Sequence, residues 1–171
     1  MSDSPTPPSS LEDLLDIHAI ARLKHRYFRC LDQKAWDELE TCFTADATAS
    51  YGGGAVELSG RDAIMTFLRD SMGSPGMLTS HRGTQPEIDL LGDGRARGVW
   101  ALEDVVIHQD FGLTIHGASF YDDRYVKIDG TWLIASTGYK RTYEEVWPRS
   151  SLEGLRISAD FWATGGRSSL I

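Results

Sequence analysis

Two side chains with complementary proton chemistry stand out in this sequence, Asp32 and His81. A histidine titrates near neutral pH, so its imidazole can take a proton from a substrate and return it. A carboxylate that hydrogen-bonds an imidazole fixes the tautomer and orientation of the ring. The residue pattern alone favours plainer interpretations, a structural or exposed histidine in a strand and an exposed aspartate at a helix end. The acid–base pair is therefore a hypothesis that requires the two groups to meet in a cavity.

Five further polar side chains are candidates for binding a substrate. Tyr27 and Tyr51 could donate hydrogen bonds to a carbonyl oxygen that gains negative charge, although a packed tyrosine with a satisfied hydroxyl is the commoner outcome. Arg141 could bind a carboxylate or phosphate, and a solvated arginine at a strand end is an equally good interpretation. Asp104 shares its predicted strand face with large apolar residues, so it either points into a polar pocket or follows a bulge. His116 lies in the next predicted strand.

Composition and charge limit the classes of protein that this chain can belong to. Its 171 residues fit one domain, and 41% hydrophobic with 25% charged residues is typical of a globular protein. The formal charge of -8 argues against nucleic acid as the main partner, because phosphate binding needs a basic surface. Residues 1–10 are polar and rich in Ser and Pro, without a signal peptide or any spanning segment, so we expect a short disordered tail on a cytoplasmic protein.

The cysteine and glycine patterns give no indication of a metal or a cofactor. Cys30 and Cys42 lack the spacing of a zinc site, and we expect buried free thiols in a reducing compartment. The glycine runs at 52–54 and 165–166 lack the strand–loop–helix context of a phosphate-binding loop. Neither pattern supplies a metal motif or a phosphate-binding loop.

The hydrophobic spacing changes once along the chain, from helical to strand-like. Helices are predicted over about residues 11–30, 34–43 and 61–71, a hairpin over 47–51 and 55–58, and long strands over 78–90, 95–109, 113–128 and 131–143. Strands this long in a meander must coil to stay packed. This order of elements predicts an α+β fold in which helices cover the concave face of the sheet and a ligand pocket lies between them.

Several segments of the chain resemble bacterial bile acid 7α-dehydratases. They are Tyr27-Phe28-Arg29-Cys30-Leu31-Asp32, Trp36-Asp37-Glu38-Leu39-Glu40, the run from Phe120-Tyr121-Asp122-Asp123-Arg124-Tyr125 to Gly130-Thr131-Trp132, Thr137-Gly138-Tyr139-Lys140-Arg141 and Tyr143-Glu144-Glu145. The order of elements also resembles the wider SnoaL-like, NTF2-like superfamily, which includes scytalone dehydratase. The resemblance runs from about residue 14 to 145. It implies a cone in which N-terminal helices pack on a strongly curved, mostly antiparallel sheet. The domain then covers 11–146, and an apolar extension over 147–171 acts as a lid or a subunit contact.

The resemblance also implies a catalytic assignment. In these dehydratases an Asp/His pair moves the protons without a cofactor, and the pair carries over to Asp32 and His81. A substrate-contacting tyrosine carries over to Tyr27 and an arginine to Arg141. Such enzymes are usually trimers, so a homo-oligomer is expected, with a trimer favoured over a dimer.

The remaining candidates bear on the choice of substrate. Tyr51 and Asp104 look equivalent to pocket residues of the family, whereas His116 departs from the bile acid enzymes and sits where scytalone dehydratase has a second pocket histidine. We therefore predict a hydro-lyase that removes water from a hydroxylated keto-steroid, similar to a bile acid, or from a related polycyclic substrate, either free or as a coenzyme A thioester. A ketosteroid isomerase, a polyketide cyclase and a non-catalytic binding or assembly module remain alternatives on the same fold.

Overall fold

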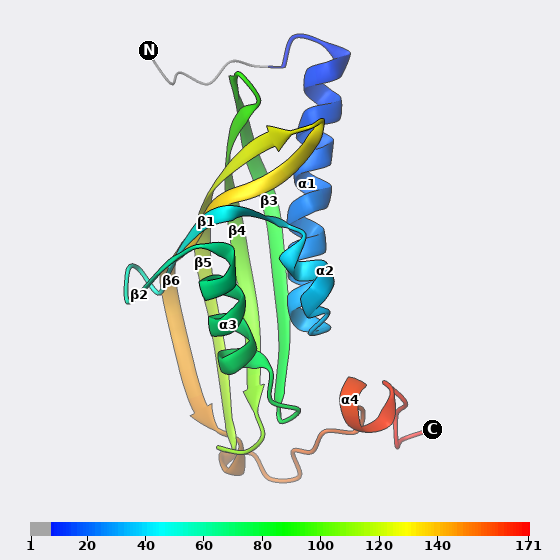
Figure 1. Ribbon diagram of the computed structural model, residues 1–171. Coiled ribbons are helices and arrows are strands. Elements are labelled where there is room, and N and C mark those ends of the chain that lie inside the picture. The colour runs from blue at the N-terminus through cyan, green and yellow to red at the C-terminus, as the bar shows by residue number, and fades with distance from the viewer. Residues whose placement is uncertain (1–7) are drawn as a thin grey trace.

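The computed structural model describes residues 8–171. In it, helices pack against one curved sheet (Figure 1). Most of the predicted N-terminal tail therefore lies outside the described residues. The elements are α1 (Leu11–Asp32), α2 (Trp36–Glu40), β1 (Phe43–Tyr51), β2 (Val56–Ser59), α3 (Arg61–Met72), β3 (Met77–Gly92), β4 (Arg95–His108), β5 (Leu113–Ile128), β6 (Thr131–Pro148), a 3-10 turn (Arg149–Ser151) and α4 (Phe161–Thr164).

Helix α1 begins at a capping box and ends at Asp32. The Ser10 hydroxyl accepts a hydrogen bond from the Asp13 amide at 3.1 Å, and the Asp13 carboxylate accepts one from the Ser10 amide at the same distance. Lys34 adopts a left-handed φ of 52°, which turns the chain just after the helix. The capping box thus starts the helix at Leu11, and the turn at Lys34 leaves Asp32 as its last residue.

The strands form one six-stranded sheet in the order β2-β1-β6-β5-β4-β3. All neighbours are antiparallel except β1 and β6, which pair in parallel. Helix α1 runs along β3, and α3 lies over the other half of the curved sheet (Figure 1). The helices pack on the concave face through a core rich in aromatic side chains, including Tyr27, Phe28, Phe43, Trp100, Tyr121 and Tyr125. The predicted α+β cone is confirmed.

Several element boundaries differ from those expected. The second helix covers only Trp36–Glu40, because Phe43 already belongs to β1, and β6 continues to Pro148. Both cysteines are free and buried, and burial raises the pKa of the Cys30 thiol to about 11. No helix within residues 8–171 combines the length and the apolar character needed to cross a membrane.

The C-terminal tail leaves the end of β6 and crosses beneath the sheet toward the end of α1 (Figure 1). Gln109 donates a hydrogen bond of 3.3 Å to the Asp160 carboxylate, and the Lys34 ammonium lies 5.8 Å from the centre of a ring of Trp162. Many apolar side chains of the tail are exposed, including Leu152, Leu155, Phe161 and Ile171. Its role as a lid or a subunit contact stays a prediction.

Candidate active site

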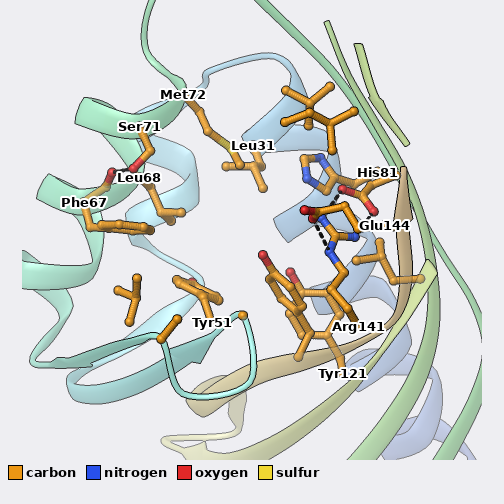
Figure 2. Close-up of a pocket in the computed structure, with 18 of the residues that line it drawn as sticks. Leu31, Tyr51, Phe67, Leu68, Ser71, Met72, His81, Tyr121, Arg141 and Glu144 are labelled. Atoms are coloured by element: carbon orange, nitrogen blue, oxygen red, sulfur yellow. Dashed lines mark hydrogen bonds and ion pairs between the residues drawn. The ribbon is translucent and has the colours of Figure 1, made fainter. Parts of the chain in front are cut away.

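A cavity of about 300 Å³ lies between the sheet, the end of α1 and helix α3 (Figure 2). Its wall is mostly apolar, with contributions from Leu31, Val56, Phe67, Leu68, Met72, Met77, Leu102, Val106 and Ile115. Its polar lining consists of His81, Asp104, Arg141, Glu144, Ser71 and the tyrosines Tyr27, Tyr51, Tyr121 and Tyr139. An apolar cavity with a few convergent polar groups is the usual form of a small-molecule site, and this one lies at the lower end of the common range of roughly 300–1,000 Å³.

The two residues of the predicted acid–base pair meet where the end of α1 reaches the first half of β3. Oδ1 of Asp32 lies 2.6 Å from Nδ1 of His81 and accepts a hydrogen bond of 2.8 Å from the Thr79 hydroxyl. Oδ2 of Asp32 accepts a hydrogen bond of 2.8 Å from the His81 amide. The carboxylate can only accept, so Nδ1 carries the proton and Nε2 is left as a base. Burial raises the pKa of Asp32, but the hydrogen bonds from His81 and Thr79 outweigh it and hold the pKa below its usual value.

The His81 ring is held in place by an aromatic neighbour as well as by the carboxylate. Phe28 stacks beside it with ring centres 6.4 Å apart and an interplanar angle of 13°. Phe28 can approach β3 because residue 83 is glycine: a Cβ there would lie 2.0 Å from Cε2 of Phe28. The histidine side chain is 5% exposed, so its ring is confined to one orientation toward the cavity.

The tyrosines form one aromatic wall of the cavity. The ring centre of Tyr121 lies 6.4 Å from that of Tyr27 and 5.4 Å from that of Tyr139, which in turn lies 5.7 Å from Tyr51. The buried hydroxyls of Tyr27 and Tyr51 lie near one another, and neither has a hydrogen-bond partner within 3.5 Å among the described residues. Burial raises the pKa of both hydroxyls well above the usual value, so they remain protonated donors. Unpaired donors in a buried wall are suited to a ligand oxygen.

A second polar cluster lies on the sheet around Arg141. Its guanidinium binds both oxygens of Asp104, with Nη2 at 3.0 Å from Oδ2, and its Nε lies 3.0 Å from Oε2 of Glu144. A register shift between Ala118 and Ser119 in the pairing of β5 with β6 interrupts the alternation, so Arg141 and Glu144 both face the cavity. The two carboxylates outnumber the single guanidinium. This arrangement favours substrate hydroxyls as ligands over a carboxylate or a phosphate.

His116 does not belong to this site. Its neighbours in β5, Ile115 and Gly117, face inward, so alternation directs His116 to the outer face of the sheet. There Nε2 lies 3.3 Å from Oε1 of Glu103, and the ring lies 6.4 Å from that of Trp147. The structure therefore does not bring His116 to the cavity with the other predicted residues, because the alternation of β5, which the resemblance did not reveal, places it on the opposite face of the sheet.

The structure brings the other predicted residues together. Those that line the cavity are Tyr27, Tyr51, His81, Asp104 and Arg141, and Asp32 lies directly behind His81. Sequence reasoning missed Tyr121, Tyr139, Glu144 and the buried Lys24. The signal for Lys24 was its spacing from Tyr27, Phe28 and Leu31, which places it on the apolar face of α1. Within residues 8–171, no three His, Cys, Asp or Glu side chains are grouped as metal ligands.

Solved structures share this fold at low sequence identity. A candidate scytalone dehydratase from Novosphingobium aromaticivorans DSM 12444 superposes with a TM-score of 0.72 at 23% identity, covering 92% of this chain and 97% of the other. Hexachlorocyclohexane dehydrochlorinase LinA-type3 from Novosphingobium barchaimii LL02 gives 0.74 at 17% identity, covering 87% and 98%. A protein with a cystatin-like fold from Nostoc punctiforme gives 0.61 at 18% identity, covering 79% and 95%. At these identities the likeness shows the fold alone.

The sequence itself matches a defined family over most of its length. The match covers residues 12–138, from the second residue of α1 to the middle of β6. That span includes Tyr27, Asp32 and His81, the strands β1 to β5 and the first part of β6. The chain therefore belongs to the SnoaL-like domain family.

Proposed function

We propose that this protein is a lyase that eliminates water from a hydroxylated cyclic ketone, with His81 as the base and Asp32 as its orienting partner. The observation that carries the proposal is the 2.6 Å contact between Nδ1 of His81 and Asp32 at the wall of a cavity. A base, an orienting carboxylate and free hydrogen-bond donors around one space are the parts that proton abstraction beside a carbonyl requires.

In the first step Nε2 of His81 takes a proton from the carbon next to the ketone, or from the vinylogous γ carbon when the substrate is an enone. The electron pair of the broken C–H bond moves toward the carbonyl oxygen, and an enolate forms. The hydroxyls of Tyr27 and Tyr51 are buried and unpaired among the described residues, so they can donate to that oxygen as it becomes negative. Asp32 stabilises the imidazolium that forms in the same step.

In the second step the carbonyl re-forms and the hydroxyl group is expelled. This hydroxyl lies on the carbon β to the carbonyl, or at the vinylogous position of an enone. The protonated His81 returns its proton to the departing oxygen, so that water leaves and the base is regenerated. General acid–base catalysis of this kind contributes roughly 10² to 10⁴ in rate. Because His116 lies outside the cavity, the proton-return step falls to His81.

The lining of the cavity supports an uncharged ring system as the substrate. Arg141 is the only Lys or Arg in the described lining, and Asp104 and Glu144 already bind it. A hydroxylated keto-steroid or a related polycyclic ketone fits this chemistry through its hydroxyls. The cavity volume of about 300 Å³ favours the smaller members of that class. Among these lining residues there is no Lys or Arg left unpaired to bind the carboxylate of a bile acid or the phosphates of a coenzyme A thioester.

The names of similar structures support elimination as the type of reaction. A dehydratase and a dehydrochlorinase are both enzymes named for the removal of a small molecule from their substrate. Both share the fold of this chain, and here the proposed base lines the cavity with an orienting carboxylate directly behind it. Elimination is therefore favoured over ring closure or non-catalytic binding.

The proposal is tested by mass spectrometry on a panel of bicyclic hydroxyketones, hydroxylated keto-steroids and their thioesters. We expect at least one compound to lose the mass of one water, with a new long-wavelength ultraviolet band as conjugation extends. His81→Ala should suppress the conversion, and His116→Ala on the outer face is the matched control that should retain it. Conversion at unchanged mass would support an isomerase instead, and binding without conversion would support a non-catalytic module.

A further inference from the structure

A fully buried lysine lies directly behind the tyrosine wall of the cavity. The ammonium of Lys24 is 3.6 Å from the ring centre of Tyr121, 4.6 Å from that of Tyr27 and 5.0 Å from that of Phe28. It lies 2.7 Å from Oδ2 of Asp123, and both side chains are 0% exposed. An ion pair is costly to bury, and apolar side chains of similar volume often replace one without loss of stability. The packing of α1 therefore does not by itself account for a lysine at this position.

The ion pair is oriented with its positive end toward the cavity wall. Asp123 accepts hydrogen bonds of 2.7 Å from the Tyr125 hydroxyl and from the Thr137 hydroxyl, neither of which lines the cavity. Lys24 contacts the rings of Tyr27 and Tyr121, and both of these residues line it. The carboxylate is thus held by groups behind the wall, while the ammonium, which also donates a hydrogen bond of 3.4 Å to the Thr137 hydroxyl, lies against the wall itself.

A cation against an aromatic ring stabilises negative charge that spreads into that ring. When a phenol donates a hydrogen bond to an enolate, part of the negative charge is shared with the phenol oxygen and its ring. The attraction to a nearby ammonium is strong here because the surroundings have a low dielectric constant. The same ammonium gains little from a neutral ketone in the ground state. Its stabilisation is therefore selective for the charged intermediate.

We propose that Lys24 is a positioning residue that strengthens Tyr27 as a hydrogen-bond donor to an oxyanion in the cavity, both directly and through the ring of Tyr121 that packs against it. This role rests on the proposed function, because it assigns a purpose to the tyrosine wall in that reaction. Lys24 touches no substrate and acts through the two rings. Asp123 keeps the buried charge compensated and away from the cavity.

The test compares a charged and a neutral ligand of nearly the same shape. 4-Nitrophenolate, at a pH at which the phenol is ionised, represents the enolate, and 4-nitroanisole represents the neutral ketone. The paired variant Lys24→Met/Asp123→Asn removes both charges together, so that no isolated ion is left in the core. The matched control is Asp16→Asn/Lys127→Met, which removes an ion pair of 2.8 Å that lies away from the cavity.

We expect the native protein to prefer 4-nitrophenolate to 4-nitroanisole. In the paired variant the phenolate should bind about tenfold more weakly, while the affinity for the anisole stays within about twofold. Equal changes for both ligands would show a merely structural role and overturn the proposal. Unchanged phenolate binding in the paired variant, or a native protein without a preference for the phenolate, would overturn it too. If the paired variant does not fold, the preference of the native protein and the variant Lys24→Gln/Asp123→Asn decide the matter.

Because this experiment measures binding, its outcome is separate from that of the proposed function. A protein that converts no hydroxyketone but shows the split between the two ligands keeps the assignment of Lys24 and loses the elimination. A protein that eliminates water without that split keeps the elimination and loses the role of Lys24.

Discussion

The packing of Phe28 over Gly83 makes a prediction that can be worked from the structure. A methyl group added by Gly83→Ala would lie 2.0 Å from Cε2 and 2.7 Å from Cζ of the Phe28 ring. The ring must then retreat until the carbons are about 3.5 Å apart. Gly83 does not adopt a left-handed φ, so the effect comes from lost space and not from backbone strain. Overpacking of this kind costs roughly 1–3 kcal/mol in the free energy of unfolding.

The same displacement should reach the acid–base pair, since Phe28 stacks on His81. A shift of about 1 Å at a reacting group can lower a rate about 10²-fold. Urea unfolding measures the loss of stability, and turnover of the substrate found in the panel measures the second effect. In a Phe28→Leu background, which creates room, the cost of Gly83→Ala should shrink. Native-like stability for Gly83→Ala alone would refute the reasoning.

Three further predictions concern the polar groups. Asp32 has a lowered pKa in the folded protein, so it contributes stability that is present above its unfolded pKa of about 3.9 and is lost as pH falls through the lower folded value. The difference in unfolding free energy between the native protein and Asp32→Asn should therefore be largest near neutral pH and shrink in acid; a constant difference would contradict this. Arg141→Gln leaves Asp104, which is 3% exposed, without its cation and should cost about 3 kcal/mol in urea unfolding, with Arg141→Lys costing less. Equal stability of all three proteins would show that the pair is not needed. Because His81 both takes and returns the proton, hydrogen and hydroxyl should leave from the same face of the ring. Loss of deuterium from a stereospecifically labelled substrate reports this, and loss from the opposite face would require a second acid.

The fold could be read from the sequence because each element carries its own local signal. The capping box of Ser10 and Asp13 lies at the expected start of α1, and the two residues Asp129-Gly130 separate strands that end at 128 and begin at 131, as predicted. The parallel pairing of β1 with β6 could not be read in this way. It joins residues about ninety positions apart, and no short-range pattern encodes such a contact.

The candidate site was predictable in part, through the spacing of residues that the family shares. The pairing of Asp32 with His81 was inferred from resemblance and is present, because a helix end and a strand bring the two together. His116 was expected in the pocket because the resemblance gave its position in the chain. The resemblance did not show which face of β5 the side chain occupies. Glu144 was missed because only the register shift in β6 turns it inward. Lys24 was missed because a lysine is rarely fully buried without a partner, and Asp123 lies far away in sequence.

The account depends most on proton abstraction by His81. A cyclic ketone from the substrate class that lacks the leaving hydroxyl cannot eliminate water, so in heavy water it can only exchange the hydrogen beside its carbonyl. Proton NMR measures this exchange directly. We predict that the native protein and His116→Ala catalyse it and that His81→Ala loses at least about 10²-fold in rate. An exchange rate in His81→Ala equal to that of the native protein would contradict the assignment of the base.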